Sequence, residues 1–187
     1  MDALVTAFVA AFLAGWGDPT QRVTARLSAR TGRPGFVILG LIVAIVASSV
    51  VAGAAGVLIA GTVSVSAMSL MVALALLYGG IAGLIPRRDP SLGSMSLPTL
   101  FTAAILCLAA ELGERAQFLT FALAGRFGSM ELAAAGATVG TLAACLPAAL
   151  LGDRFFEAVP LRAIRYAIAG LFLVAGFIVA VLALQLA

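Results

Sequence analysis

Two seven-residue stretches of this 187-residue chain match each other 96 positions apart, and both carry acids in or at the end of apolar segments. The first is Gly15–Gln21 (GWGDPTQ) and the second is Glu111–Gln117 (ELGERAQ). The same shift aligns further identical residues: Ala14 with Ala110, Arg30 with Arg126, Gly40 with Gly136, Ala73 with Ala169, and Gly80 with Gly176. The repeat predicts two related halves. Each half places acids in or at the end of an apolar segment, where burying a charged side chain costs free energy.

The chain is too apolar for a soluble domain. Hydrophobic residues make up 63% of it and charged residues 10%, and its mean hydropathy is +1.19. The apolar runs are continuous over about 20 residues, which is typical of membrane-spanning helices and unlike the ~10-residue alternation of barrel strands. We therefore expect an all-α integral membrane protein. Its six expected transmembrane segments are 3–21, 36–60, 66–85, 97–124, 131–151 and 161–186.

The halves are expected to have opposite orientations in the membrane. A loop rich in proline and arginine at 86–97 would link a first three-helix repeat, 1–85, to a second, 98–187. Because three helices per repeat is an odd number, the second repeat enters the membrane from the other side, which predicts an inverted-topology arrangement.

Arginines predict the orientation. The opposite side of the membrane carries at most Arg115 and Arg126, whereas predicted loops one, three and five carry Arg22, Arg26, Arg30, Arg33, Arg87, Arg88, Arg154, Arg162 and Arg165. Positive charge collects on the cytoplasmic side. We expect cytoplasmic loops one, three and five and two external termini in a bacterial-type inner membrane. The basic charge is then explained by topology, and no nucleic-acid partner is expected.

Three acids are the candidate metal ligands. Glu111 and Glu114 stand three apart in one expected helix, so they would share a face, and Asp18 occupies the matching place in the first half. Each charged side chain facing lipid would cost about 2.5–3.5 kcal/mol, so we expect all three to face the interior. Inversion would bring the two motifs together, and neutral ligands would come from Thr20, Gln21, Gln117 and backbone carbonyls.

Such a site is built from oxygen alone and suits a hard divalent cation such as Mn²⁺ or Ca²⁺. The chain contains no histidine, the commonest ligand of zinc and copper. Carboxylates crowded in a low dielectric also hold protons more tightly, so metal and protons would compete for the same oxygens. The alternative is that Glu111 pairs with Arg115 along one helix and that Asp18 ends its helix in water.

Other residues leave alternatives open. Pro19 either ends a short first helix or breaks a longer one and frees carbonyls for an ion. Trp16 is either an interfacial anchor or a gate over the site. Glu131 and Asp153 bracket the fifth segment and are expected to be loop or cap residues.

Small residues and cysteines are expected to serve packing. Gly136 and Gly140 have the GxxxG spacing that suits close helix contact, and contact within this chain is the simpler interpretation. Cys107 and Cys145 lie inside predicted helices and are expected to be apolar fillers. No Walker loop, nucleophile elbow, Rossmann glycine pattern or Cys/His metal box occurs in the sequence. We expect neither an enzyme nor a tightly bound cofactor.

The repeated motif resembles the Glu-x-Gly-Asp-(Lys/Arg)-(Ser/Thr) signature of the transmembrane protein 165/Gdt family. The resemblance covers nearly the whole chain, and the stretches 158–162 and 169–172 are similar to that family's last loop and helix. It implies exchange of Mn²⁺ or Ca²⁺ for protons. It also implies membership of a broader group that includes exporters of lysine and heavy metals.

The chain departs from this signature in both motifs. The second has Glu114 in place of Asp and Ala116 in place of the hydroxyl residue, and the first has Gly15 in place of Glu and Pro19 in place of the basic residue. Fewer charges should weaken divalent cation binding, and Gly15→Glu is expected to strengthen it. The favoured hypothesis is a divalent cation/proton antiporter in the lipid bilayer. The alternatives are a transport-inactive accessory subunit of a membrane complex and an exporter of another small solute, and homo-oligomers stay open.

Overall fold

The structure, a computed structural model, describes residues 1–85, 92 and 97–184, so most of the expected linker at 86–97 lies outside it. Within these residues every regular element is a helix, and no strand occurs. The helices are α1 (Asp2–Gly15), α2 (Pro19–Thr31), α3 (Pro34–Ala60), α4 (Val65–Leu84), α5 (Thr99–Glu111), α6 (Arg115–Phe127), α7 (Met130–Leu151), α8 (Arg154–Ala158) and α9 (Leu161–Ala183). The expected all-α class is confirmed.

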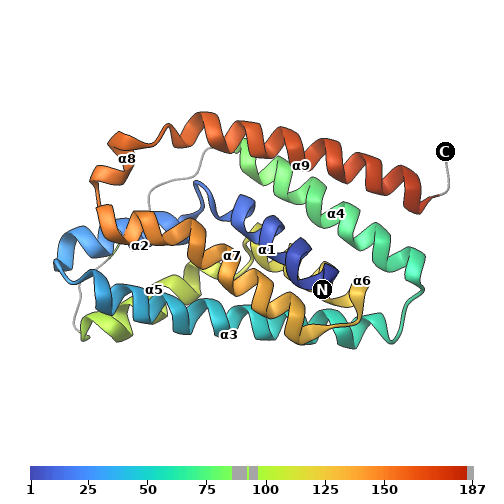
Figure 1. The fold of residues 1–187 in the computed structure, drawn as a ribbon, viewed down its shortest axis with the longest axis horizontal. Coiled ribbons are helices and arrows are strands. Elements are labelled where there is room, and N and C mark those ends of the chain that lie inside the picture. Colours follow the sequence, from blue (N-terminus) through green and yellow to red (C-terminus); the bar gives the residue numbers. More distant parts are fainter. Residues whose placement is uncertain (86–91, 93–96, 185–187) are drawn as a thin grey trace.

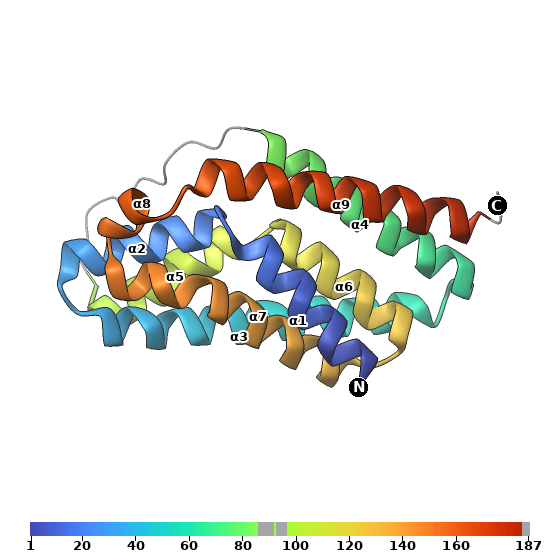
Figure 2. The ribbon, with the colours of Figure 1, turned by 45° about the horizontal axis from the view of Figure 1, so that its top comes forward.

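The helices form an elongated bundle. α4 and α9 run side by side along one face in both views (Figures 1 and 2). Four helices, α3, α4, α7 and α9, are long and apolar enough to cross a membrane, and the bent pair of α1 and α2 makes a fifth candidate span. α5 is a shorter apolar helix. Large apolar side chains such as Val51, Leu58 and Phe177 point outward. The chain is thus an integral membrane protein with four to five candidate spans among the described residues.

The expectation of one continuous helix over 3–21, and of another over 97–124, is wrong. α1 ends at Gly15 and α2 begins at Pro19, with a bend of 62° between them. α5 and α6 are likewise separated by residues 112–114. The cause is the same in both places, because Gly17 (φ 73°) and Gly113 (φ 78°) adopt the left-handed conformation that glycine alone reaches without strain.

A second correction concerns the first predicted loop. Arg22, Arg26 and Arg30 lie on helix α2 and not in a loop. Pro19 stands at the first position of this helix, where its missing N–H costs no hydrogen bond. The continuous apolar runs on which the segment boundaries rest could not reveal α2, since most of its side chains are polar.

Glycines allow close helix contacts between the two halves. A side chain at Gly136 of α7 would collide with the Leu4 carbonyl and the Phe8 amide nitrogen of α1. A side chain at Gly40 of α3 would collide with the Leu100 carbonyl and the Ala104 amide nitrogen of α5, the same contact shifted by 96 residues. Gly140 packs against α1 one turn further on. The interpretation of the GxxxG spacing as packing within the chain is confirmed.

The core also holds both cysteines. Cys107 and Cys145 are fully buried in one apolar cluster with Val23, Leu41 and Ile45, as expected of apolar fillers. Asp153 is the N-cap residue of α8, as expected, although its side chain makes no cap hydrogen bond. Glu131 lies inside the first turn of α7, so the expectation of a loop or cap position is wrong for this residue.

Candidate functional site

The candidate site lies where the two helix breaks meet inside the bundle. Asp18, Glu111 and Glu114 are only 4%, 2% and 5% exposed. The Arg115 Nε lies 3.6 Å from Asp18 Oδ1, and Arg115 Nη2 donates a hydrogen bond of 2.8 Å to the Trp16 carbonyl. One side chain of the second motif therefore holds both the carboxylate and a backbone carbonyl of the first motif.

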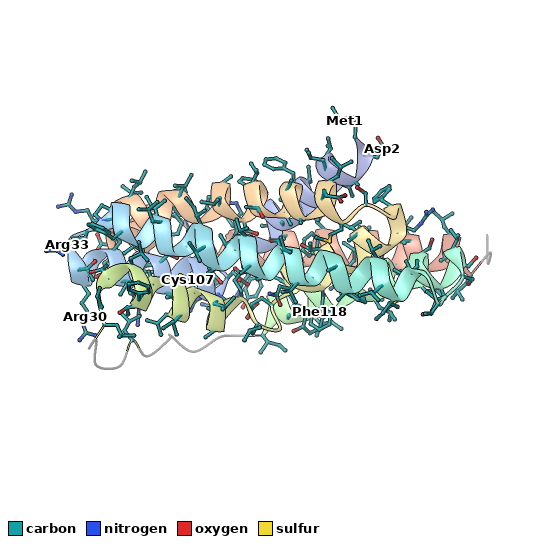
Figure 3. All side chains as sticks on the ribbon, turned by 90° about the horizontal axis from the view of Figure 1, so that it is seen from below. Met1, Asp2, Arg30, Arg33, Cys107 and Phe118 are labelled. Atoms are coloured by element: carbon teal, nitrogen blue, oxygen red, sulfur yellow. The ribbon has the colours of Figure 1, made fainter. Side chains whose placement is uncertain are left out.

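The position of the site along the bundle can be followed in Figure 3, where Cys107 of α5 and Phe118 of α6 lie on either side of the second break. Arg30 and Arg33 mark one end of the bundle, and Met1 and Asp2 lie toward the other end (Figure 3). The second break, which carries Glu111 and Glu114, thus lies between the two ends of the bundle.

Asp18 and Glu114 have the same structural role in the two halves. Each is the residue before a helix, with φ and ψ of −78° and 154° at Asp18 and −78° and 155° at Glu114. The N-terminal ends of α2 and α6 carry partial positive charge from the helix dipole. This charge lowers the cost of holding carboxylates in the interior.

A glutamine braces each break. The Gln21 Oε1 accepts a 2.9 Å hydrogen bond from the Gly17 N–H, and the Gln117 Oε1 accepts one of 3.4 Å from the Gly113 N–H. The Gln21 Nε2 also donates to the Ala144 carbonyl at 2.6 Å, which ties the first break to α7. In this structure both residues bind the backbone of the breaks, and their role as neutral ligands stays a prediction.

The Glu111 carboxyl group, at the meeting point of the motifs, is incompletely satisfied by hydrogen bonds. Glu111 Oε2 accepts a long hydrogen bond of 3.5 Å from the Ser48 hydroxyl, while Glu111 Oε1 is buried and has no hydrogen-bond partner among the described residues. The Thr20 hydroxyl lies beside the Glu111 carboxyl group and interacts with it. Buried oxygens of this kind are uncommon and call for a ligand, ion or water.

The three predicted metal ligands share one buried region without closing around a point. Asp18 interacts with the carboxyl groups of both Glu114 and Glu111. Among the residues that the structure describes, however, no three Asp, Glu, Cys or His side chains are grouped closely enough to hold a metal ion. The argument that Glu111 and Glu114 share the face of one helix is wrong, because Glu111 ends α5 and Glu114 precedes α6.

Arg115 pairs with Asp18 in the other motif. The alternative expectation, a pair between Arg115 and Glu111 along one helix, did not include this partner. Pro19 follows a genuine break, and the Trp16 carbonyl freed there binds the guanidinium. The Trp16 ring packs near Phe12 and Phe155, at centroid distances of 6.0 and 6.2 Å. The backbone of Trp16 thus contacts the site through Arg115.

Two further residues at the site carried no distinguishing sequence signal. Ser48 is one of several small polar residues in an apolar helix, and only its place one repeat before Ala144 could have singled it out. Arg165 of α9 is buried with its aliphatic stem over Gly17, and its Nε has no hydrogen-bond partner among the described residues.

Position 15 lies against α7 and has no free space for a side chain. A Cβ added at Gly15 would lie 2.7 Å from the Cβ of Ala144 on α7. A side chain at position 15 therefore requires α7 to move, and stronger metal binding in Gly15→Glu stays a prediction.

Comparison with known proteins identifies the family. The sequence profile of the family described as "Divalent cation/proton antiporter GDT1" matches residues 3–91 and again residues 99–186. The chain belongs to this family. A curated relative from Vibrio cholerae serotype O1, named "Putative manganese exporter", is 30% identical over 177 residues, covering 92% of this chain and 88% of the relative. No solved structure matches the chain. The resemblance seen in the motifs is confirmed, and transport of a divalent cation across a membrane is the function class of this GDT1-family chain.

Proposed function

We propose that this GDT1-family protein exchanges a divalent cation, Mn²⁺ in preference to Ca²⁺, for protons. The observation that carries the proposal is the burial of three carboxylates at two facing helix breaks, where Glu111 Oε1 has no hydrogen-bond partner among the described residues. Carboxylate, hydroxyl and carbonyl oxygens suit Mn²⁺ and Ca²⁺. The name of the Vibrio relative supports Mn²⁺ as the first candidate.

The proposed ligands are Asp18, Glu111 and Glu114, with Thr20, Gln21 and Gln117 as neutral ligands. The ion would draw the three acids closer together than they lie in the structure. Ion and protons compete because each neutralises the same buried carboxylates. A site emptied of metal would therefore return across the membrane with protons bound, and this couples the two movements.

We further propose six membrane crossings in two inverted repeats, 1–85 and 98–187, with α5 and α6 together as the fourth crossing. Two features support this arrangement. The family profile matches the two halves separately. The contacts of Gly80 with Leu173 and Ala169 recur, 96 residues on, as those of Gly176 with Leu77 and Ala73. The positions of Arg30 and Arg33 support a cytoplasmic location for that end of the bundle, and external termini.

The test is ion flux in proteoliposomes. Purified protein is reconstituted with a pH-sensitive dye inside, and Mn²⁺, Ca²⁺, Mg²⁺ and Zn²⁺ are supplied in turn, with and without a pH gradient. We expect Mn²⁺ movement that drives opposite proton movement, with Ca²⁺ as a weaker substrate. Absence of flux under every cation and pH gradient would overturn the proposal.

A transport-inactive accessory subunit is the second candidate. The tight contact of Gly15 with Ala144 favours it, because the first motif has one acid fewer and no space to regain it. This candidate predicts no flux in the wild type and copurification with a larger membrane complex. Flux of an unrelated solute, with no response to divalent cations, would instead support the exporter alternative.

A further inference from the structure

Arg115 is the buried cation that pairs with Asp18 in the candidate site. Its side chain is 3% exposed. It stands at the first position of α6, bridges to Asp18 at 3.6 Å and donates to the Trp16 carbonyl at 2.8 Å. The charged groups that act on Asp18 are Glu114, Arg115 and Glu111. The guanidinium is therefore part of the charge balance of the three acids.

We propose that Arg115 is the fixed counter-charge of the site and determines which cation charge the site prefers. This inference rests on the proposed function, because it assumes that the three acids bind the transported ion. Asp18 and the charged groups that act on it, Glu114, Glu111 and the Arg115 guanidinium, together carry two formal negative charges, which match one divalent cation. Arg115 cannot lose its charge in a protein, so its contribution is constant.

Arg115 is anchored, so its charge stays in place when an ion binds to the acids. The hydrogen bond to the Trp16 carbonyl holds its head at the first break, while its backbone belongs to the second. A guanidinium that is already held at two points loses little conformational entropy when an ion binds. Its repulsion of that ion is felt strongly, since charges interact far more in a dry interior than in water.

Repulsion by a fixed charge scales with the charge of the ion, and this gives the inference a distinctive signature. Removing Arg115 should improve binding of every cation, and the logarithm of the improvement should be half again as large for a trivalent ion as for a divalent one. A residue that only supported the fold would not produce this ratio.

The experiment measures Mn²⁺ and La³⁺ binding to the purified full chain in nanodiscs by calorimetry. In Arg115→Gln we expect about tenfold tighter binding of Mn²⁺ and about thirtyfold tighter binding of La³⁺. Arg115→Lys keeps the charge and should keep the wild-type ratio of La³⁺ to Mn²⁺ affinity. Arg126→Gln is the matched control, because Arg126 lies exposed on the same helix, and its ratio should equal that of the wild type.

An equal gain for both ions in Arg115→Gln, weaker binding of both, or a changed ratio in Arg115→Lys would overturn the inference. If Arg115→Gln fails to fold, Arg115→Met makes the same comparison with a neutral side chain that keeps the apolar stem. The comparison of Arg115→Lys with the wild type does not depend on either neutral variant. Failure of the proposed function is separately visible, since it would appear as wild-type protein that binds and transports no divalent cation at all.

Discussion

Gly15 of α1 lies directly against Ala144 of α7, so that a Cβ added at Gly15 would be 2.7 Å from the Cβ of Ala144. Gly15→Ala should therefore destabilise the protein by about 1–3 kcal/mol through overpacking. Gly15→Glu should destabilise it further. The measurement is thermal unfolding in detergent with a thiol-reactive dye, which is suitable because Cys107 and Cys145 are both fully buried until the protein unfolds.

Two variants control this prediction. Ala144→Gly removes the atom that would be struck, so Gly15→Ala combined with Ala144→Gly should be more stable than the two separate effects imply. Gly170→Ala changes an exposed helix position with open space around it and should leave stability nearly unchanged. If Gly15→Ala melts like the wild type, the close approach of α1 and α7 is not as the structure has it.

Glu111→Gln should abolish Mn²⁺ flux in proteoliposomes and leave the protein folded. The amide keeps the size of the side chain and can still accept from Ser48, but it removes the charge that binds the ion. Glu131→Gln makes the same change at an exposed position in the first turn of α7 and should transport normally. Wild-type flux that survives Glu111→Gln would remove Glu111 from the mechanism.

Gly113→Ala should cost about 1–2 kcal/mol of stability, the penalty of the left-handed conformation for a residue with a Cβ. No atom lies within 4 Å of the added Cβ, so the cost would be conformational and not steric. Gly113→Asn should cost less, because asparagine tolerates this conformation. Thermal unfolding of both variants checks the order, and equal stability of all three proteins would mean that φ at position 113 is not positive.

Orientation can be tested with one cysteine at each end of α3. In a background with Cys107→Ala and Cys145→Ala, Arg33→Cys should react with an impermeant reagent only from the cytoplasmic side, and Thr62→Cys only from outside. Both positions are exposed, and the 27 residues of α3 separate them by about 40 Å of helix rise. Labelling with the sides exchanged would reverse the proposed topology.

The sequence by itself determined the class of protein and the candidate site residues. Long apolar runs require membrane helices, since lipid offers no partner for an open backbone. The repeated motif singled out Asp18, Glu111 and Glu114, and the cost of ionised groups in lipid predicted their burial, which the structure confirms. The motif also indicated the family, to which the chain belongs.

Only the tertiary structure decided how these residues meet. Apolar runs show where a chain can cross a membrane but not the sign of φ at Gly17 and Gly113, so they predict neither the two helix breaks nor the polar helix α2. The pairing of Arg115 with Asp18 was equally invisible. A charged side chain on a helix can pair with a residue of the same helix or with a residue of another helix, and the partner depends on which helices lie close to each other. That approach is decided by packing between helices distant in sequence.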